Sequence, residues 1–252
     1  MALQLADQHP LLAAALPPRQ IAKGESIVEE DDPLSSLLLL CGGAAQGIRT
    51  LEDGSQQMAA FFVSGDALNP GDLALGRSRI SIRTLTPALV LAIPLTELDA
   101  LMETRPAVAR GLWRETAFQA SIQREWLAWL GRKSAEARLS HFLCEVAYRL
   151  KTGEDDCDVF DLPLTQHELA DVLGVSVVHV NRVLQQLRKK NLIDLQRSRL
   201  TIRNREGLYA VAEFDPAYLR ISETAQFNEN TSVRTFQCFR RSKLAHMAPA
   251  TV

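Results

Sequence analysis

Apolar residues recur at helical spacing in two short stretches between residues 165 and 190. Thr165 and Glu168 form a capping box, in which the hydroxyl and the carboxylate accept hydrogen bonds from backbone N–H groups at a helix start. The first helix is predicted to end at Gly174, because Gly makes the required turn without a Cβ penalty. Ser176 is placed to cap a second helix over 177–190. Its buried stripe comprises Val180, Val183, Leu184 and Leu187. The pattern predicts a helix-turn-helix.

A predicted wing follows the second helix. Residues 193–196 and 199–203 have the pattern of two short strands around Arg197-Ser198. Residues 176–205 contain eight Lys or Arg and one acid, a net charge of +7, which leaves −9 on the rest of a chain whose total is −2. One basic module in a weakly acidic protein is typical of nucleic-acid binders. The alternative is a solvated charged face on an ordinary helical hairpin.

Residues 21–94 alternate short apolar runs with turn signals. The clearest hairpin joins residues 46–51 to 57–61 across Asp53-Gly54. Many short strands at regular intervals predict a small β-roll, similar to a jelly roll. With helices following the roll, the fold class is α+β.

A long helix is predicted over residues 107–132. Its apolar seam recurs at alternating spacings of three and four. A helix of this length spans roughly 38 Å, too long for a small roll to cover, so we expect the seam to meet a second copy of the chain. The alternative is packing against the roll alone. The seam residues expected at the dimer interface are Glu115, Phe118, Ile122, Trp126 and Trp129.

Four segments follow from these patterns: a β-roll over residues 1–98, a dimerisation helix over 99–132, a winged helix-turn-helix domain over 133–221 and a disordered tail over 222–252. Within the third segment, an amphipathic helix capped by Ser134 should supply the core beneath the helix-turn-helix. An exposed acidic loop follows at 152–158, and a strand at 159–162 could join the sheet of the wing.

Composition excludes several classes of function. The 252-residue chain has 46% hydrophobic residues, no apolar run near the ~18 residues of a membrane span, and no basic stretch preceding its short N-terminal apolar run. We therefore expect a cytosolic protein. The four cysteines are scattered, without metal-ligand or redox spacing. No nucleophile elbow, phosphate loop or metal-ligand pattern indicates an enzyme.

These patterns together resemble the Crp/Fnr family of bacterial transcription regulators over about residues 20–220. The motifs are Thr165-Gln-x-Glu-Leu-Ala-x-x-Leu-Gly174, Val178-His-Val-Asn-Arg182-x-Leu-Gln-x-Leu-Arg188 and Asn191-Leu-Ile. The stretches Arg124-Glu-Trp-Leu and Phe214-Asp-Pro-Ala-Tyr-Leu219 resemble one subgroup. The resemblance implies a homodimer that places two recognition helices in successive major grooves of a palindromic operator, with RNA polymerase as a further partner.

The resemblance also assigns DNA contacts. Arg182 occupies the recognition-helix position that typically binds guanine O6 and N7, and Asn181 could contact adenine. Val177 and Val178 stand where relatives commonly have polar residues, so the sequence preference should differ; Val178 could contact a thymine methyl. The expected phosphate contacts are Thr165, Ser176, His179, Arg197 and Arg199.

The sequence does not identify a small-molecule effector. Cyclic-nucleotide-binding members carry Gly-Glu and Arg-Ser, whereas this chain has Gly65-Asp66 and Ser78-Arg79, with Arg77 and Arg83 nearby. The shorter acid and displaced Arg disfavour a cyclic nucleotide at a pocket containing Asp66, Arg77, Arg79 and Arg83. The N-terminal Cys cluster of iron–sulfur members is absent, and residues 21–95 contain no His for a haem. Either another small molecule binds the roll, or the dimer needs no effector.

Two readings from other classes remain open. The chain could be a ligand-sensing interaction module whose helix-turn-helix no longer binds DNA, although the basic winged module argues against this. An enzyme is the third reading, disfavoured because the five scattered His residues have no evident partners.

Overall fold

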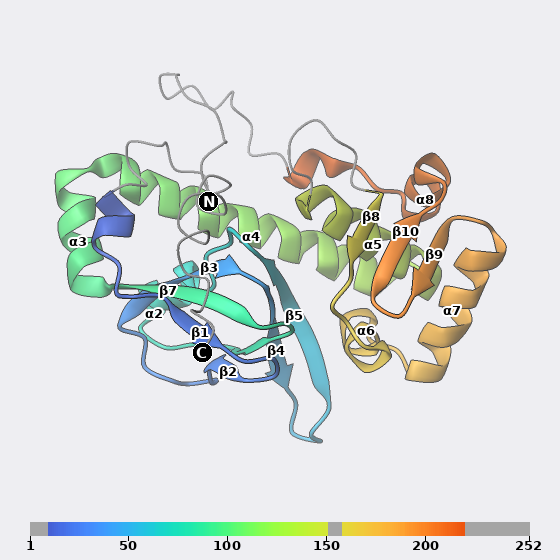
Figure 1. Cartoon of the computed structure of the whole chain (residues 1–252), viewed down its shortest axis with the longest axis horizontal. Helices are drawn as coiled ribbons and strands as arrows, with labels where there is room; N and C mark the ends of the chain where they lie inside the picture. The colour runs from blue at the N-terminus through green and yellow to red at the C-terminus, as the bar shows by residue number, and fades with distance from the viewer. Residues whose placement is uncertain (1–9, 151–157, 220–252) are drawn as a thin grey trace, which may run out of the picture.

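The computed structural model describes residues 10–150 and 158–219. A β-roll lies beneath one end of the long helix α4 (Pro106–Arg132), and a helical module with a small sheet lies at the other end of that helix (Figure 1). Most of the expected acidic loop and the expected tail lie outside the described residues.

The predicted roll is confirmed. One sheet has the strand order β1-β7-β3 and the other β2-β6-β4-β5, all antiparallel. The strands are β1 Arg19–Ile21, β2 Ser26–Val28, β3 Ser36–Gly42, β4 Ala44–Thr50, β5 Gln56–Val63, β6 Ser81–Thr84 and β7 Ala88–Pro94. The β4–β5 pair is the hairpin expected across Asp53-Gly54, with both strands longer than predicted.

The leucine run of β3 is explained by burial on both faces. Because side chains alternate along a strand, Leu37 and Leu39 pack into one apolar cluster, with Ile93. Leu40 packs into the other cluster, with Val90. A strand covered on both sides has no polar face, which is why its pattern is continuous rather than alternating.

Helix α2 Pro70–Leu75 lies within the roll, between β5 and β6, and two helices connect the roll to the second module: α3 Leu95–Thr104 and α4 Pro106–Arg132. The expected segment boundary at residue 98 falls inside α3. The chain instead breaks at Arg105, with φ −136° and ψ 82°, because a residue before proline disfavours the helical conformation. None of the described helices is long and apolar enough to cross a membrane.

The winged helix-turn-helix follows as predicted. Its elements are α5 Ala135–Leu150, β8 Val159–Asp161, α6 Gln166–Leu173, α7 Val177–Lys189, β9 Ile193–Gln196, β10 Arg199–Ile202, α8 Arg205–Ala212 and η1 Pro216–Leu219. Both bonds of the Thr165–Glu168 capping box form, and Gly174 has the left-handed φ of 63°. Ser176 caps α7 by accepting a hydrogen bond from the backbone N–H of His179. Strand β8 joins the wing in the order β8-β10-β9.

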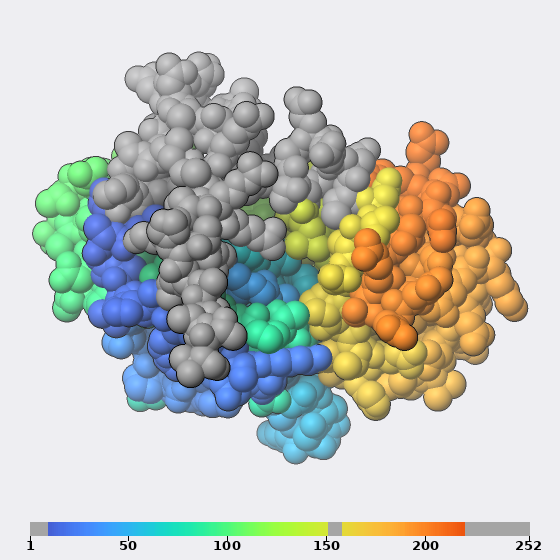
Figure 2. Space-filling model, viewed as in Figure 1, coloured from blue at the N-terminus to red at the C-terminus, as the bar shows by residue number. Residues whose placement is uncertain are grey.

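The apolar core of the winged module extends into the roll. Met58, Phe61 and Val63 of β5 belong to the same cluster as Phe142 of α5 and the buried face of α7. The Phe61 and Phe142 rings meet edge to face at 5.5 Å. In the space-filling view the roll and the winged module adjoin directly (Figure 2). The orientation of the recognition helix is therefore tied to the roll by packing.

The expected dimer seam on α4 is corrected by the structure. Glu115, Ile122, Trp126 and Trp129 are buried within the chain itself, and Phe118 is partly buried against the same core. Their side chains contact the roll and the winged module. These two domains together cover the length of α4, which the roll alone is too small to cover. A different stripe faces outward, with Trp113 and Leu127 each 73% exposed.

A buried histidine beneath the helix-turn-helix makes stability depend on pH. His141 stacks on Tyr218, and its Nε2 lies 3.0 Å from the Tyr218 hydroxyl. Burial lowers the pKa of His141 from 6.5 to about 4, and the nearby charge of Lys133 acts in the same direction. The unfolded chain therefore binds this proton more tightly, so stability should fall as the pH drops from 6.5 toward 4.

For this group the two pKa values correspond to a loss of about 2 kcal/mol on going from neutral pH to about pH 5. Urea unfolding of the wild type and His141→Gln at about pH 7.5 and about pH 5 measures it. The variant should lose less stability on acidification than the wild type. Equal losses in the two proteins would contradict this assignment.

Candidate DNA-binding surface and sensor cavity

The outer face of α7 is open. Val178 is 80% exposed, Arg182 is exposed, and Val177 and Asn181 are half-buried at the same face. The Arg182 guanidinium lies 3.4 Å from Nδ1 of His179, one turn earlier. The opposite stripe of α7 is fully buried, so the helix is fixed from behind while its expected base-contacting face is free.

The wing adds exposed positive charge. Arg197 takes a left-handed φ of 57° at the two-residue turn between β9 and β10, and Arg199 begins β10. Of the eight basic residues between 176 and 205, three form ion pairs with acids: Lys190 with Glu136, Arg203 with Asp194 and Arg205 with Asp158. The other five have no acid partner among the described residues. Of these, Arg188 donates to the Leu195 carbonyl, which leaves Arg182, Lys189, Arg197 and Arg199. These four are the charges available to phosphates or base edges.

The capping residues are placed differently from the arginines. The hydroxyls of Thr165 and Ser176 are exposed but already accept backbone hydrogen bonds at the starts of α6 and α7. Each hydroxyl still has its own proton to donate to a phosphate oxygen. All nine expected DNA contacts lie on one module: on α7, on the N-caps of α6 and α7, and on the wing.

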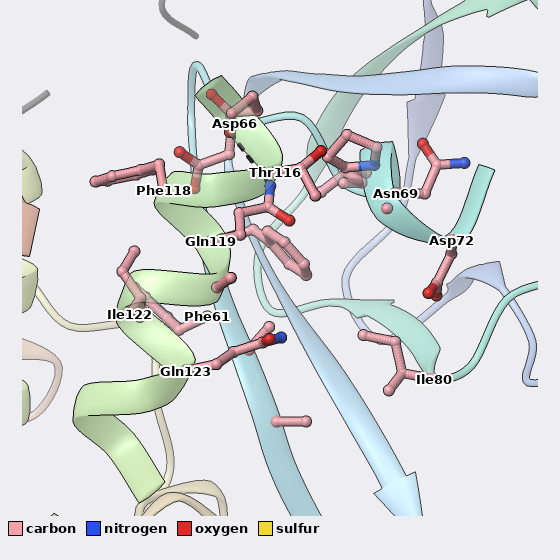
Figure 3. Close-up of a pocket in the computed structure, with 18 of the residues that line it drawn as sticks. Phe61, Asp66, Asn69, Asp72, Ile80, Thr116, Phe118, Gln119, Ile122 and Gln123 are labelled. Atoms are coloured by element: carbon pink, nitrogen blue, oxygen red, sulfur yellow. Dashed lines mark hydrogen bonds between the residues drawn. The ribbon is translucent and has the colours of Figure 1, made fainter. Parts of the chain in front are cut away.

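A cavity of about 170 Å³ lies between α4 and the roll (Figure 3). Phe118, Gln119 and Ile122 line it from α4, Phe61 from β5, and Asp72 from α2. Gln119 donates to the Ala67 carbonyl at 2.6 Å and to Glu115 at 3.2 Å. Burial raises the pKa of Glu115, so the carboxyl of this wall is held toward its neutral form.

Only one of the four expected pocket residues, Asp66, lines this cavity. Arg77 is exposed and donates to the Asp31 carbonyl at 2.7 Å. Arg79 is exposed and lies 3.7 Å from the Asp31 carboxylate. Arg83 lies on β6 opposite Gln46 and Ser26, away from the cavity lining. The expected Arg cluster is corrected, because the Arg77–Arg79 turn faces the acidic residues after β2.

The cavity residues do not fit a cyclic nucleotide. Among the described residues that line the cavity, three carry carboxyl groups, Asp66, Asp72 and Glu115, and one, Arg149, carries a positive charge. Arg149 is already paired with Asp66 at 2.5 Å. An anionic phosphate would meet carboxylates without a free guanidinium. The volume is also below the roughly 300–1,000 Å³ of sites for ligands of that size.

Sequence reasoning missed the buried polar network beside this cavity. Glu145 of α5 is fully buried, and its Oε2 accepts from Trp126 Nε1 and from the Tyr218 hydroxyl, both at 2.9 Å. Arg149 lies 3.3 Å from Glu145 Oε1. Two features of the sequence could have indicated this network: the charged i, i+4 pair on the apolar face of α5, and Tyr218 within the Phe214–Leu219 motif.

The charges of this network depend on one another. Burial raises the pKa of Glu145, and Arg149 acts against that shift. Burial alone would lower the pKa of Arg149, but the Asp66 and Glu145 carboxylates more than offset it, so the pKa is raised. The guanidinium therefore stays charged, and the network holds one cation between two carboxyl groups.

Family comparisons agree with this architecture. The pattern described as Cyclic nucleotide-binding domain matches residues 18–105, and that described as Crp-like helix-turn-helix domain matches residues 137–211. The solved structure of FixK2 from Bradyrhizobium japonicum is similar, with a TM-score of 0.70 and 27% identity, and covers 77% of this chain and 96% of that one.

Two curated relatives have comparable similarity. Electron transport regulator A of Shewanella oneidensis is 27% identical over 178 residues, covering 71% of each chain. Transcriptional activator protein FnrL of Cereibacter sphaeroides is 28% identical over 189 residues, covering 73% of this chain and 75% of the relative.

The roll, the long helix and the winged helix-turn-helix define a class: DNA-binding regulators with a sensor domain. The two domain matches occur here in the same order on one chain. The chain belongs to the Crp/Fnr family of transcription regulators.

Proposed function

We propose that this regulator acts as a homodimer that binds a palindromic operator through α7 of each copy. The observation that carries this proposal is the open, basic face of α7 and the wing, with Arg182, Arg197 and Arg199 exposed and without acid partners among the described residues. Arg182 makes the principal base contact, and Arg197 and Arg199 contact phosphates. The same open face argues against an interaction module that has lost DNA binding.

The second copy docks on the exposed stripe of α4. Trp113, Ala117, Ala120, Arg124 and Leu127 follow one another at spacings of four, three, four and three, a heptad seam about 21 Å long at 1.5 Å per residue. Large apolar side chains at both ends of this stripe are open to solvent. Arg124, the fourth residue of this stripe, is a polar seam position of the kind that sets register at some cost in stability.

The proposal includes no catalytic step and no resident cofactor. Among the residues that the structure describes, no three metal-ligating side chains come together. The absence of an iron–sulfur cluster, a haem or an enzymatic activity stays a prediction, as do the cytosolic location and a contact with RNA polymerase.

Replacing Arg182 tests its role in contacting a base of the operator. Arg182→Ala should weaken operator binding by about 1–3 kcal/mol and relax specificity at one position of each half-site, because one bidentate base contact is lost. Arg197→Ala is the matched control: it should weaken all sequences alike and reduce the salt slope by about 1, as expected for a phosphate contact. Footprinting and affinity measurements on selected duplexes give both. An Arg182→Ala protein that protects the same palindrome with unchanged affinity would contradict this role.

Replacing Leu127 tests the dimer seam. Leu127→Arg should convert the dimer to a monomer in sedimentation experiments, because two buried cations would face each other across the two-fold axis. Leu75→Arg is the control, since Leu75 is 66% exposed but lies on α2, off the seam. A dimer that survives Leu127→Arg at the same concentration, or dissociates equally with Leu75→Arg, would exclude this interface.

Cyclic nucleotides should not stabilise the protein. A ligand at about 100 times its Kd contributes about 2.7 kcal/mol, which raises the Tm of a chain this size by several degrees. Cyclic AMP and cyclic GMP, each tested up to millimolar concentration, should leave the Tm unchanged, because none of the described residues that line the cavity offers a free cation to the phosphate. A saturable rise in Tm with either nucleotide would show that this description of the cavity is wrong.

A further inference from the structure

One strand of the roll holds the winged module at two separate points. Near the start of β5, Gln57 donates from Nε2 to the Asp171 carbonyl at 2.6 Å, at the C-terminal end of α6. At the end of the strand, the Phe61 carbonyl accepts from Nη1 of Arg149 on α5 at 2.9 Å. Four residues of strand separate these points by about 13 Å. Together with the packing of Phe61 on Phe142 between them, two contacts at that separation oppose rotation of the winged module against the roll.

The second point is reinforced by a buried ion pair. Arg149 is 8% exposed, and its Nη2 lies 2.5 Å from Oδ2 of Asp66, in the turn after β5. The same carboxylate accepts from the backbone N–H of Val63 at 2.7 Å, which fixes its direction. A buried ion pair is weak evidence for stability, but it favours one geometry strongly, because other geometries leave the charges unpaired.

Motion of α5 is transmitted to the recognition helix. Phe142 and Leu143 of α5 share one core with Val180 and Leu187 of α7, so packing fixes the orientation of α7 relative to α5. We infer that Asp66 is a positioning residue for DNA binding: by holding Arg149 it sets the direction of α7 relative to the roll. This inference rests on the proposed dimeric DNA reader.

Position matters because a dimer must place two recognition helices in successive major grooves, about 34 Å apart. A module held by Gln57 and Asp66 arrives at the operator already oriented, whereas a free module loses rotational freedom on binding. The Asp66–Arg149 pair therefore favours one spacing of half-sites over others. A single half-site, which requires no particular spacing, does not depend on the pair.

The variant Asp66→Asn removes the charge with little change in shape, and Glu145 still compensates Arg149. Three duplexes serve as probes. The first is the operator that purified wild-type protein selects from random duplexes. The second is the same operator with two extra central base pairs, and the third is a single half-site. Asp66→Asn should bind the intact operator about tenfold more weakly, lose part of the discrimination between the two spacings, and bind the half-site as the wild type does.

A second variant and a control separate positioning from a folding defect. Gln57→Ala breaks the other contact and should flatten the discrimination between spacings in the same way. Asp72→Asn is the control, because Asp72 lines the same cavity but, among the described residues, accepts only from the Arg79 backbone within the roll, and it should behave as the wild type.

Three other results would each contradict the inference that Asp66 positions α7. Wild-type affinity and spacing discrimination in Asp66→Asn would overturn the inference. An equal loss on the half-site would also overturn it, since the change would then be structural rather than positional. If wild-type protein selects no inverted repeat at all, the proposed function itself fails, and this inference fails with it.

Discussion

The junction between the roll and the winged module depends on the hydrogen bonds and the ion pair of one fully buried carboxyl group, that of Glu145. It lies where α4, α5 and the C-terminal turn η1 meet, and it is satisfied by Trp126, Tyr218 and Arg149. A buried carboxyl without partners would be costly, so these three segments must meet in one arrangement. Through Arg149 the same group reaches Asp66, which ties the sensor roll to the winged module.

This junction changes the role of the long helix. A helix that only bridged two chains would bury its apolar seam in the partner, yet α4 buries Glu115, Ile122, Trp126 and Trp129 against its own chain. Its outward stripe of Trp113 to Leu127 is left for the partner. Helix α4 therefore packs against both domains of its own protomer and, in the proposed dimer, also forms the interface with the second copy.

Local signals made the helix-turn-helix predictable from sequence. The Thr165–Glu168 capping box, Gly174 and Ser176 each act within one turn of the helix that they begin or end, and all take their expected conformations. The face of α4 was not predictable in this way, because both of its stripes carry Trp at heptad spacing. The Asp66–Arg149 pair joins residues 83 positions apart, and nothing in the local pattern of either residue indicates the other.

In the proposed dimer, this chain supplies one half of a DNA-binding surface with two-fold symmetry. In vitro selection from random duplexes with the purified protein, followed by measurement of the protein-to-duplex ratio, shows whether it does. We expect an inverted repeat with half-sites about one helical turn apart, bound by two chains. Enrichment of no sequence, or of an unpaired site bound by one chain, would contradict it.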